Sequence, residues 1–148
     1  MARILVVDDE PYAVELLFEY LTAKNHTVIT ASDGEEALRR VKEDRPHLIL
    51  LDYCMPKMNG IEVLKKVREI DASVAVIMVT AVHEEEMGRE ALMLGAHDFI
   101  TKPIDFKYLE KSLWYKLTMM TLKIPTQTCG TGVWGSVARR RAGSSEST

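Results

Sequence analysis

The chain has 148 residues, 47% of them hydrophobic, which is enough for one globular domain with a full core. Residues 1–122 carry 15 Lys and Arg against 21 Asp and Glu, a net charge of −6, whereas residues 123–148 carry four against one, or +3. The acidic body argues against nucleic-acid binding by residues 1–122.

The sequence shows no signal for export. Cys54 and Cys129 lie far apart and fit neither a disulfide framework nor the spacing of a zinc site. The apolar run before Asp8 is too short for the core of a signal peptide, and no apolar run approaches the length of a membrane span. We therefore expect a reduced, cytoplasmic protein with no membrane segment.

Five short apolar runs alternate with helical patterns. The expected strands are Ile4–Val7, Thr27–Ala31, Leu48–Leu51, Val74–Val79 and Asp98–Thr101. Apolar residues recur at helical spacing in the four intervals, as Val14, Leu17, Phe18 and Leu21, then Ala37, Leu38 and Val41, then Leu64, Val67 and Ile70, and finally Met87, Ala91 and Leu94. The alternation predicts an α/β fold of the (βα)5 type, a doubly wound parallel five-stranded sheet between two layers of helices.

Local signals mark three helix starts. Asp33 precedes Glu36 by three residues, and Asn59 precedes Glu62 by three, which is the spacing of helix caps. Pro11 fits the first turn of the first helix.

The fifth helix, expected from Phe106 to Leu122, carries two apolar stripes. The stripe expected to face the sheet consists of Phe106, Leu109, Leu113, Leu117 and Met120. The second stripe consists of Tyr108, Tyr115, Met119 and Leu122. We expect the second stripe to pack against a partner protein or a second subunit, and the alternative is that the end of the chain folds back over it.

The composition changes after Pro125. Residues 123–148 are rich in Gly, Ser and Thr, contain the basic run Arg139–Arg141, and have too few periodic apolar residues for a second domain. We interpret this segment as a flexible tail with no output domain and the basic run as solvated. The expected division is therefore a domain over residues 1–122 and a tail over residues 123–148.

Polar residues follow four of the expected strands. Asp8 and Asp9 follow the first strand, Asp52 the third, Thr80 the fourth and Lys102 the fifth. The carboxyl ends of parallel strands meet at one edge, where open α/β sheets bind ligands, so these side chains should converge. Taken alone, Asp52 is equally well explained as a residue that ends a strand. Only its combination with Asp8, Asp9, Thr80 and Lys102 indicates a site.

The converging residue types point to phosphoryl chemistry. Carboxylates at one edge repel one another unless a cation joins them, and a small cluster of hard oxygen ligands suits Mg²⁺. A lysine ammonium and a threonine hydroxyl beside the cluster provide partners for an anion. A carboxylate nucleophile, a divalent metal, Lys and Thr are together the groups needed to form an aspartyl phosphate.

The motifs that contain these residues resemble the receiver domain of response regulators in two-component signalling. They read VVDDE at 6–10, LLDYCMPKMNG at 50–60, VTA at 79–81 and GAHDFITKP at 95–103. The resemblance covers about residues 2–122. It implies a flavodoxin-like fold with strand order 2-1-3-4-5.

The resemblance implies that Asp52 is the phosphoacceptor. Asp9 and Asp52 would bind Mg²⁺ directly, Asp8 largely through water, and the backbone carbonyl of Cys54 would complete the protein ligands. The phosphoryl donor would be a sensor histidine kinase or a histidine phosphotransfer protein. The protein would then be a signalling module with slow, self-catalysed chemistry rather than a turnover enzyme.

Further roles follow from the same resemblance. Lys102 would contact the phosphoryl group, and the bond between Lys102 and Pro103 would be cis. Thr80 would move toward the phosphoryl oxygen, and Phe99 would follow inward as the aromatic member of the switch. The switch would change the binding of a second copy or a downstream protein through the fourth and fifth helices.

Two residues that flank the site bear on the lifetime of the phosphoryl group. Cys54 is a weak hydrogen-bonding partner and Val82 is none, so neither would orient a hydrolytic water, and we expect a long-lived aspartyl phosphate. We interpret Cys54 as a buried, inert hydrophobe in preference to a redox residue.

Three other classes of protein share part of the pattern. A flavin-binding protein would need a Gly/Ser/Thr-rich phosphate loop where this chain has DDEP at 8–11. A phosphatase of the haloacid-dehalogenase type would need a second acid at position 54, which is cysteine. A phosphorylation-independent pseudo-receiver would lack part of the acid set, which is complete here.

Overall fold

The structure is a computed structural model that describes residues 2–81 and 84–122. The chain divides into two compact units, Met1–Ser112 and Leu113–Thr148. The expected tail over residues 123–148, together with Val82 and His83, lies outside the described residues.

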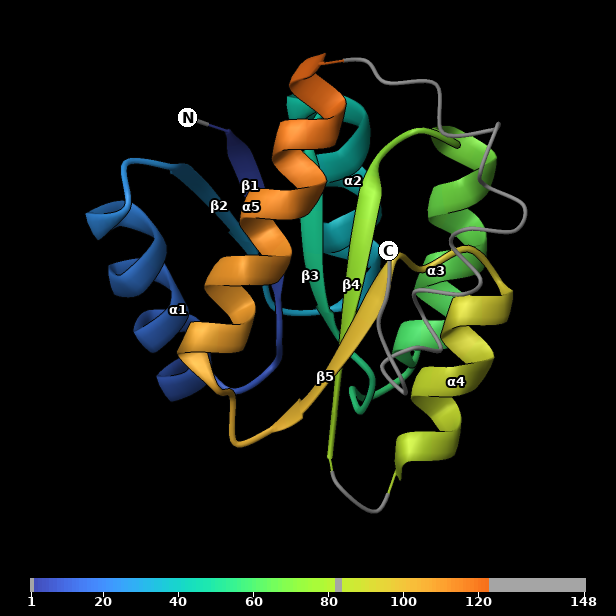
Figure 1. Cartoon of the computed structure of the whole chain (residues 1–148). Helices are drawn as coiled ribbons and strands as arrows, with labels where there is room; N and C mark the ends of the chain where they lie inside the picture. Colours follow the sequence, from blue (N-terminus) through green and yellow to red (C-terminus); the bar gives the residue numbers. More distant parts are fainter. Residues whose placement is uncertain (1, 82–83, 123–148) are drawn as a thin grey trace. The chain divides into compact units, whose positions relative to one another are not determined.

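The five expected strands form one parallel sheet. They are β1 (Arg3–Val7), β2 (Thr27–Ala31), β3 (Leu48–Asp52), β4 (Ala75–Ala81) and β5 (Asp98–Lys102). Their order is β2-β1-β3-β4-β5, which confirms the order that the resemblance implied (Figure 1). All five residues of β3, at the centre of the sheet, are buried, as its continuous apolar sequence predicts for a strand covered on both faces.

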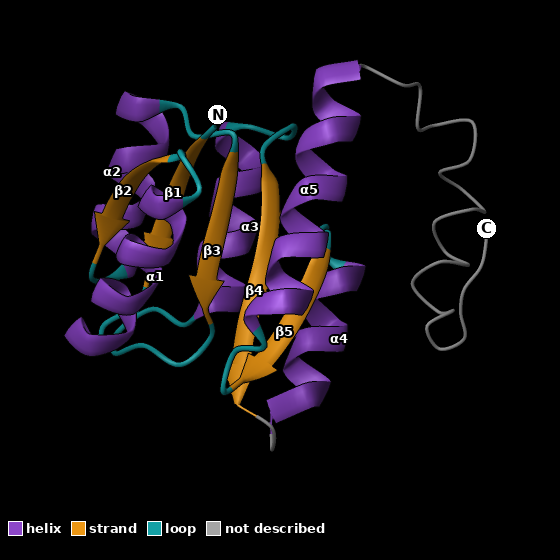
Figure 2. Cartoon of the chain, turned by 60° about the vertical axis from the view of Figure 1, so that its left-hand side comes forward, coloured by secondary structure: helices purple, strands orange, loops and turns teal. Residues whose placement is uncertain are grey.

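Helices alternate with the strands, which confirms the predicted fold class. They are α1 (Pro11–Ala23), α2 (Gly34–Asp44), α3 (Gly60–Ile70), α4 (Glu85–Met93) and α5 (Phe106–Leu122). Figure 2 shows α1 on one face of the sheet and α2 and α3 on the other, beside α4. The ring of Tyr20 on α1 lies 4.6 Å from the ring of Phe106, so the first turn of α5 packs beside α1.

The main hydrophobic core lies between the sheet and the helices α2, α3 and α4. Its strand residues include Leu5, Ile49, Leu51, Val76 and Met78, and its helix residues include Ala37, Val41, Leu64, Val67 and Ala91. Full burial of one such large side chain contributes about 1.5–3 kcal/mol. The core therefore fixes the strand register that places the carboxyl ends of β1, β3, β4 and β5 together.

Three strands extend further than predicted. β3 includes Asp52, β4 includes Thr80, and β5 includes Lys102, whereas the prediction placed these residues just beyond the strands. Their backbones remain in register with neighbouring strands, Asp52 with Val79 and Thr80 with Thr101. The sheet itself therefore positions these side chains.

The predicted helix starts are confirmed. Asn59 and Glu62 form a capping box at α3, in which the Asn59 side chain accepts from the N–H of Glu62 at 3.0 Å and the Glu62 side chain accepts from the N–H of Asn59 at 2.9 Å. At α2, the Asp33 side chain accepts from the N–H of Glu36 at 2.8 Å. Pro11 is the first residue of α1.

The apolar residues of α1 that follow helical spacing differ in burial. Leu17 and Leu21 are buried, but Phe18 is 43% exposed. Phe18 lies at the edge of the apolar stripe, and it lines an open cavity of about 470 Å³ that also reaches Asp8 and Asp9.

Three histidines close the amino-terminal edge of the sheet. Each accepts a hydrogen bond at Nδ1 from a backbone N–H beside or on a neighbouring strand, His26 from Ala2 at 3.3 Å, His47 from Arg3 at 3.0 Å and His97 from Val76 at 3.3 Å. Burial, followed by nearby positive charge, lowers the pKa of both His26 and His47. Within residues 2–81 and 84–122, no histidine belongs to a metal-binding cluster.

An arginine joins the ends of α3 and α4 at the same edge. The guanidinium of Arg68 donates to the carbonyl of Val74 and to that of Gly95, both at 2.7 Å. Gly95 has a φ of +110°, and a Cβ there would lie 2.9 Å from Nε of Arg68. The positive φ therefore favours glycine at this turn, and a side chain there would displace the guanidinium of Arg68.

Candidate functional site

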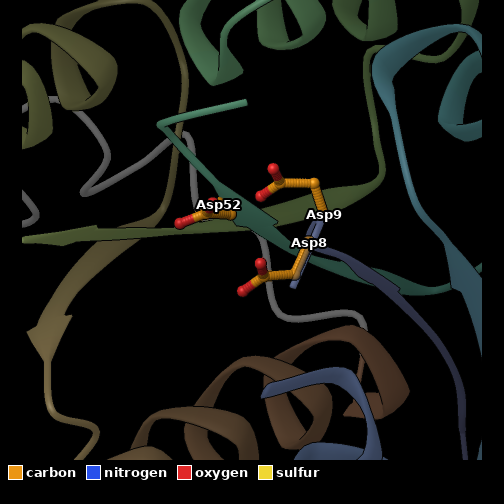
Figure 3. Close-up of side chains that lie close together, drawn as sticks. All are labelled: Asp8, Asp9 and Asp52. Carbon is orange, nitrogen blue, oxygen red and sulfur yellow. The ribbon is translucent and has the colours of Figure 1, made fainter. Parts of the chain in front are cut away.

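Three carboxylates converge at the carboxyl-terminal edge of the sheet. Asp8, Asp9 and Asp52 each offer an oxygen, and these oxygens lie within 4.8 Å of one another (Figure 3). Asp8 and Asp52 are buried, and Asp9 is exposed. The structure thus brings together the three acids that the sequence placed after the first strand and at the third.

Local backbone contacts hold the two buried acids. The N–H of Asp8 bonds to the carbonyl of Ala31 at 3.2 Å, and its side chain accepts from the N–H of Glu10 at 3.0 Å, a bond typical of an Asx turn. A Cβ on Gly60 would lie only 2.6 Å from the carbonyl oxygen of Asp52. Glycine at this position lets the start of α3 pack directly on the backbone of Asp52.

Lys102 connects the two buried carboxylates. Its ammonium lies 3.0 Å from Oδ1 of Asp52 and 3.3 Å from Oδ2 of Asp8. Lys102 therefore reaches the acids from β5, and the bond that follows it, to Pro103, is cis as the resemblance implied.

The negative charges of the site outnumber its positive charge. Burial and then the charge of Asp8 raise the pKa of Asp52 to about 6, although Lys102 acts in the opposite direction. Burial alone would lower the pKa of Lys102, but its bond to Asp52 and the charges of both acids raise it overall. One ammonium faces three carboxylates, so ionised Asp52 is stabilised incompletely.

This imbalance fits a divalent cation. The donor set consists of carboxylate oxygens that lie within 4.8 Å of one another, which matches the preference of Mg²⁺ for hard oxygen ligands. An additional positive charge would also relieve the repulsion that raises the pKa of Asp52. The acidic cluster is therefore compatible with a metal site.

Thr80 follows Val79, the residue paired with Asp52, and Phe99 on β5 pairs with Met78 on β4. Thr80 is fully buried, and its Oγ1 has no hydrogen-bond partner among the described residues. Phe99 is half-buried and packs on α4, where a Cβ on Gly88 would lie 2.4 Å from its ring. A buried hydroxyl without a partner is energetically costly, so the Oγ1 of Thr80 is available to bind a group that enters the site.

The interpretation of Cys54 as a buried residue was wrong. Cys54 is exposed, because it follows the end of β3 in the loop that leads to α3. Local desolvation, followed by the charge of Glu84 and then that of Asp52, raises the pKa of its thiol. The fraction of reactive thiolate at neutral pH is therefore reduced.

A contact between β4 and the start of α4 was not predicted from the sequence. The N–H of Ala81 donates to Oε1 of Glu84 at 3.1 Å. Ala81 directly follows Thr80, so this carboxylate lies at the same edge as the acids. Spacing alone could not reveal the bond, because Ala81 ends a strand and has no capping side chain.

Comparison with known proteins agrees with this geometry. The response regulator receiver domain matches residues 4–113. The chain belongs to this family. Receiver domains of this kind are signalling modules rather than classical enzymes.

Curated relatives of this receiver include regulators of different lengths. It is 48% identical over 101 residues to the alkaline phosphatase synthesis transcriptional regulatory protein PhoP of Bacillus subtilis, covering 68% of this chain and 42% of PhoP. It is 38% identical over 108 residues to the chemotaxis protein CheY of Treponema pallidum, covering 71% of this chain and 75% of CheY. The chain therefore spans less than half of PhoP but most of CheY.

Solved receiver structures are similar in fold. A response regulator receiver domain protein from Clostridium thermocellum superposes with a TM-score of 0.80 at 27% identity, covering 84% of this chain and all (100%) of that one. A CheY-like receiver from Methanospirillum hungatei gives a TM-score of 0.78 at 27% identity, covering 84% and 99%. In the part of this receiver that the structure describes, no helix is long and apolar enough to cross a bilayer.

Proposed function

We propose that this receiver accepts a phosphoryl group on Asp52 from a histidine kinase or a histidine phosphotransfer protein. The observation that carries the proposal is the geometry around Asp52, a buried carboxylate at the end of the central strand with Lys102 at 3.0 Å and two further acids beside it. The family match and the similarity to PhoP and CheY support the same function.

In the transfer, one carboxylate oxygen of Asp52 attacks the phosphorus of a phosphohistidine. A new O–P bond forms as the N–P bond breaks, and the imidazole nitrogen leaves with the bonding electron pair and takes up a proton. The ammonium of Lys102, which pairs with the Asp52 carboxylate before the transfer, would then pair with the phosphoryl oxygens. Burial of Asp52 excludes water around the mixed anhydride.

The acids would also hold Mg²⁺, with Asp9 and Asp52 as direct ligands and Asp8 acting largely through water. The carbonyl of Cys54 is the remaining proposed ligand. The bound metal would supply charge neutralisation for the phosphoryl group. Exposed Asp9 and buried Asp8 would differ in this role, because only Asp9 lies open to a hydrated ion.

The phosphoryl group would act on a switch formed by Thr80 and Phe99. The free hydroxyl of Thr80 would donate to a phosphoryl oxygen, and the space that Thr80 vacates would favour a deeper position of Phe99. Phe99 packs on Gly88, so this change would reach α4. We propose that α4 and α5 carry the response to a second copy or a downstream protein, and that residues 1–122 form the receiver.

Phosphoryl labelling tests the proposal. Acetyl phosphate with Mg²⁺ should label the wild type but not Asp52→Asn, and borohydride trapping with mass spectrometry should locate the label at Asp52. Asp33→Asn is the matched control, since Asp33 caps α2 and does not belong to the acidic cluster. Equal labelling of Asp52→Asn and the wild type would exclude Asp52 as the acceptor.

A further inference from the structure

The start of α4 carries a carboxylate that the proposed chemistry does not use. Glu84 is the N-cap residue of α4, yet its side chain makes no capping bond to that helix. Its Oε1 instead accepts from the backbone N–H of Ala81 at 3.1 Å, in the direction of the site. Ala81 is the last residue of β4 and directly follows Thr80.

The N–H of Ala81 is available because the strands separate at this edge. Within the ladder between β3 and β4, the N–H of Tyr53 donates to the carbonyl of Val79 at 2.9 Å. The next acceptor, the carbonyl of Tyr53 just after β3, receives the N–H of Gly60 at 2.8 Å instead. The N–H of Ala81 therefore leaves the ladder as a donor beside Asp52.

The carboxylate of Glu84 lies near the entrance to the site. Its Oε1 lies 3.1 Å from the backbone nitrogen of Ala81, at the carboxyl end of β4. Cys54 follows Asp52 by two residues and is exposed. Glu84 therefore lies at the same edge of the sheet as the acidic cluster, where an anionic phosphoryl group would enter.

A carboxylate oxygen on a backbone N–H marks a position that binds anions. Lys102, the hydroxyl of Thr80 and the N–H of Ala81 are three donors at the same edge of the sheet as Asp52, and Lys102 contacts Asp52 directly. Lys102 and Ala81 already hold carboxylates, so a phosphoryl oxygen can reach this N–H only after the Glu84 side chain leaves it.

We propose that Glu84 is an internal competitor of the phosphoryl group for the N–H of Ala81. This inference rests on the proposed function at Asp52. Without phosphate, Glu84 occupies the N–H and holds the start of α4 against β4. With phosphate, the N–H binds a phosphoryl oxygen and Glu84 is released, so phosphorylation frees the start of α4 at the cost of one internal bond.

The bond also resembles a local helix-start contact, and the chain offers a control for that role. At α3, Glu62 accepts from the N–H of Asn59, three residues earlier, at 2.9 Å. That bond is reciprocated by the Asn59 side chain, whereas Ala81 has no side chain that can reciprocate. Glu62→Ala therefore removes the same type of bond and the same charge from another helix start.

The test measures binding of beryllofluoride, a phosphoryl mimic, with saturating Mg²⁺. Loss of a hydrogen bond to a charged competitor predicts about tenfold tighter binding in Glu84→Ala. Glu84→Gln keeps an uncharged acceptor and should show a smaller gain. Glu62→Ala should bind as the wild type does. The amide proton of Ala81, followed by NMR, should move upfield in Glu84→Ala without ligand.

The remaining outcomes separate the two proposals. Unchanged or weaker binding in Glu84→Ala, or equal gains in Glu84→Gln and Glu84→Ala with an unmoved Ala81 amide, would overturn the competitor role while leaving Asp52 as the acceptor. A wild-type protein that binds no beryllofluoride and takes no label at Asp52 would overturn the proposed function and this inference with it. Glu84→Gln, which retains the acceptor, guards against misfolding of the alanine variant.

Discussion

Asp52→Asn should stabilise the receiver at neutral pH when Mg²⁺ is absent. The pKa of the Asp52 carboxyl is raised from 3.8 to about 6, so the folded state binds this proton more tightly than the unfolded state does. The contribution of Asp52 to the free energy of unfolding is therefore greatest in acid, falls as the pH rises from about 4 to about 6, and stays low above that range. Asparagine does not titrate and removes this loss.

The expected magnitude follows from the shift. A pKa difference of about two units corresponds to roughly 3 kcal/mol, and solvent around the partly open site reduces this to about 1–2 kcal/mol. The variant also loses the ion pair between Lys102 and Asp52 at 3.0 Å, but Lys102 retains Asp8 at 3.3 Å. We therefore expect a gain of about 1–2 kcal/mol near pH 7.5 and none near pH 4.

Urea unfolding, followed by circular dichroism in EDTA across this pH range, measures the effect. Asp44→Asn is the matched control, because Asp44 also pairs with a cation, Arg40 at 3.3 Å, but lies outside the acidic cluster. With Mg²⁺ at 100 times its Kd, the wild type should gain about 2.7 kcal/mol and Asp52→Asn much less. Parallel pH profiles for Asp52→Asn and the wild type would refute the reasoning.

Three further variants test other parts of the structure. The first variant is His47→Asn in the Asp52→Asn background, which keeps an acceptor at the Nδ1 position but cannot titrate. The loss of stability as the pH falls below about 6.5 should therefore be smaller in this variant. An unchanged dependence of the urea midpoint on pH would argue against a contribution from His47. Gly88→Ala should destabilise the fold by about 1–3 kcal/mol, because the added methyl group would clash with Phe99. The same substitution should destabilise the fold much less in a Phe99→Ala background. Additive effects in this double-mutant cycle would exclude the contact. Thr80→Val removes a buried hydroxyl that has no partner among the described residues. The unphosphorylated variant should be as stable as the wild type or up to about 1 kcal/mol more stable, and its phosphate-dependent spectral changes should be weaker. A clear loss of stability would mean that the hydroxyl is already hydrogen-bonded.

Much of the fold was predictable because the apolar pattern, the helix-cap residues and the order of the elements all indicated the same fold. Apolar runs set the strands, and cap spacings set the starts of α2 and α3. The alternation of strands and helices then fixed the parallel sheet, which forces Asp8, Asp52 and Lys102 to one edge. The strand ends were placed too early, because polar residues such as Asp52 break an apolar run without breaking the backbone ladder.

The features that the sequence did not reveal depend on which backbone groups meet across strands. The histidine contacts require the register between neighbouring strands, and a single His before a strand carries no such information. Glu84 reaches Ala81 only because the ladder opens at Tyr53. The exposure of Cys54 was not predictable from the hydrophobicity of cysteine, because the path of the loop after β3 decides it.

The contact between Arg68 and Gly95 has a mechanical consequence for α4. The guanidinium joins the turn after this helix to the end of α3, whereas the start of α4 lies at the edge of the sheet that carries the acids, where Glu84 accepts from the N–H of Ala81. The helix is about 13 Å long, so a tilt of a few degrees about Gly95 carries its start through about 1 Å while its far end stays in place. A change beside Asp52 that tilts α4 about the turn at Gly95 would therefore displace the start of the helix more than the end next to Arg68.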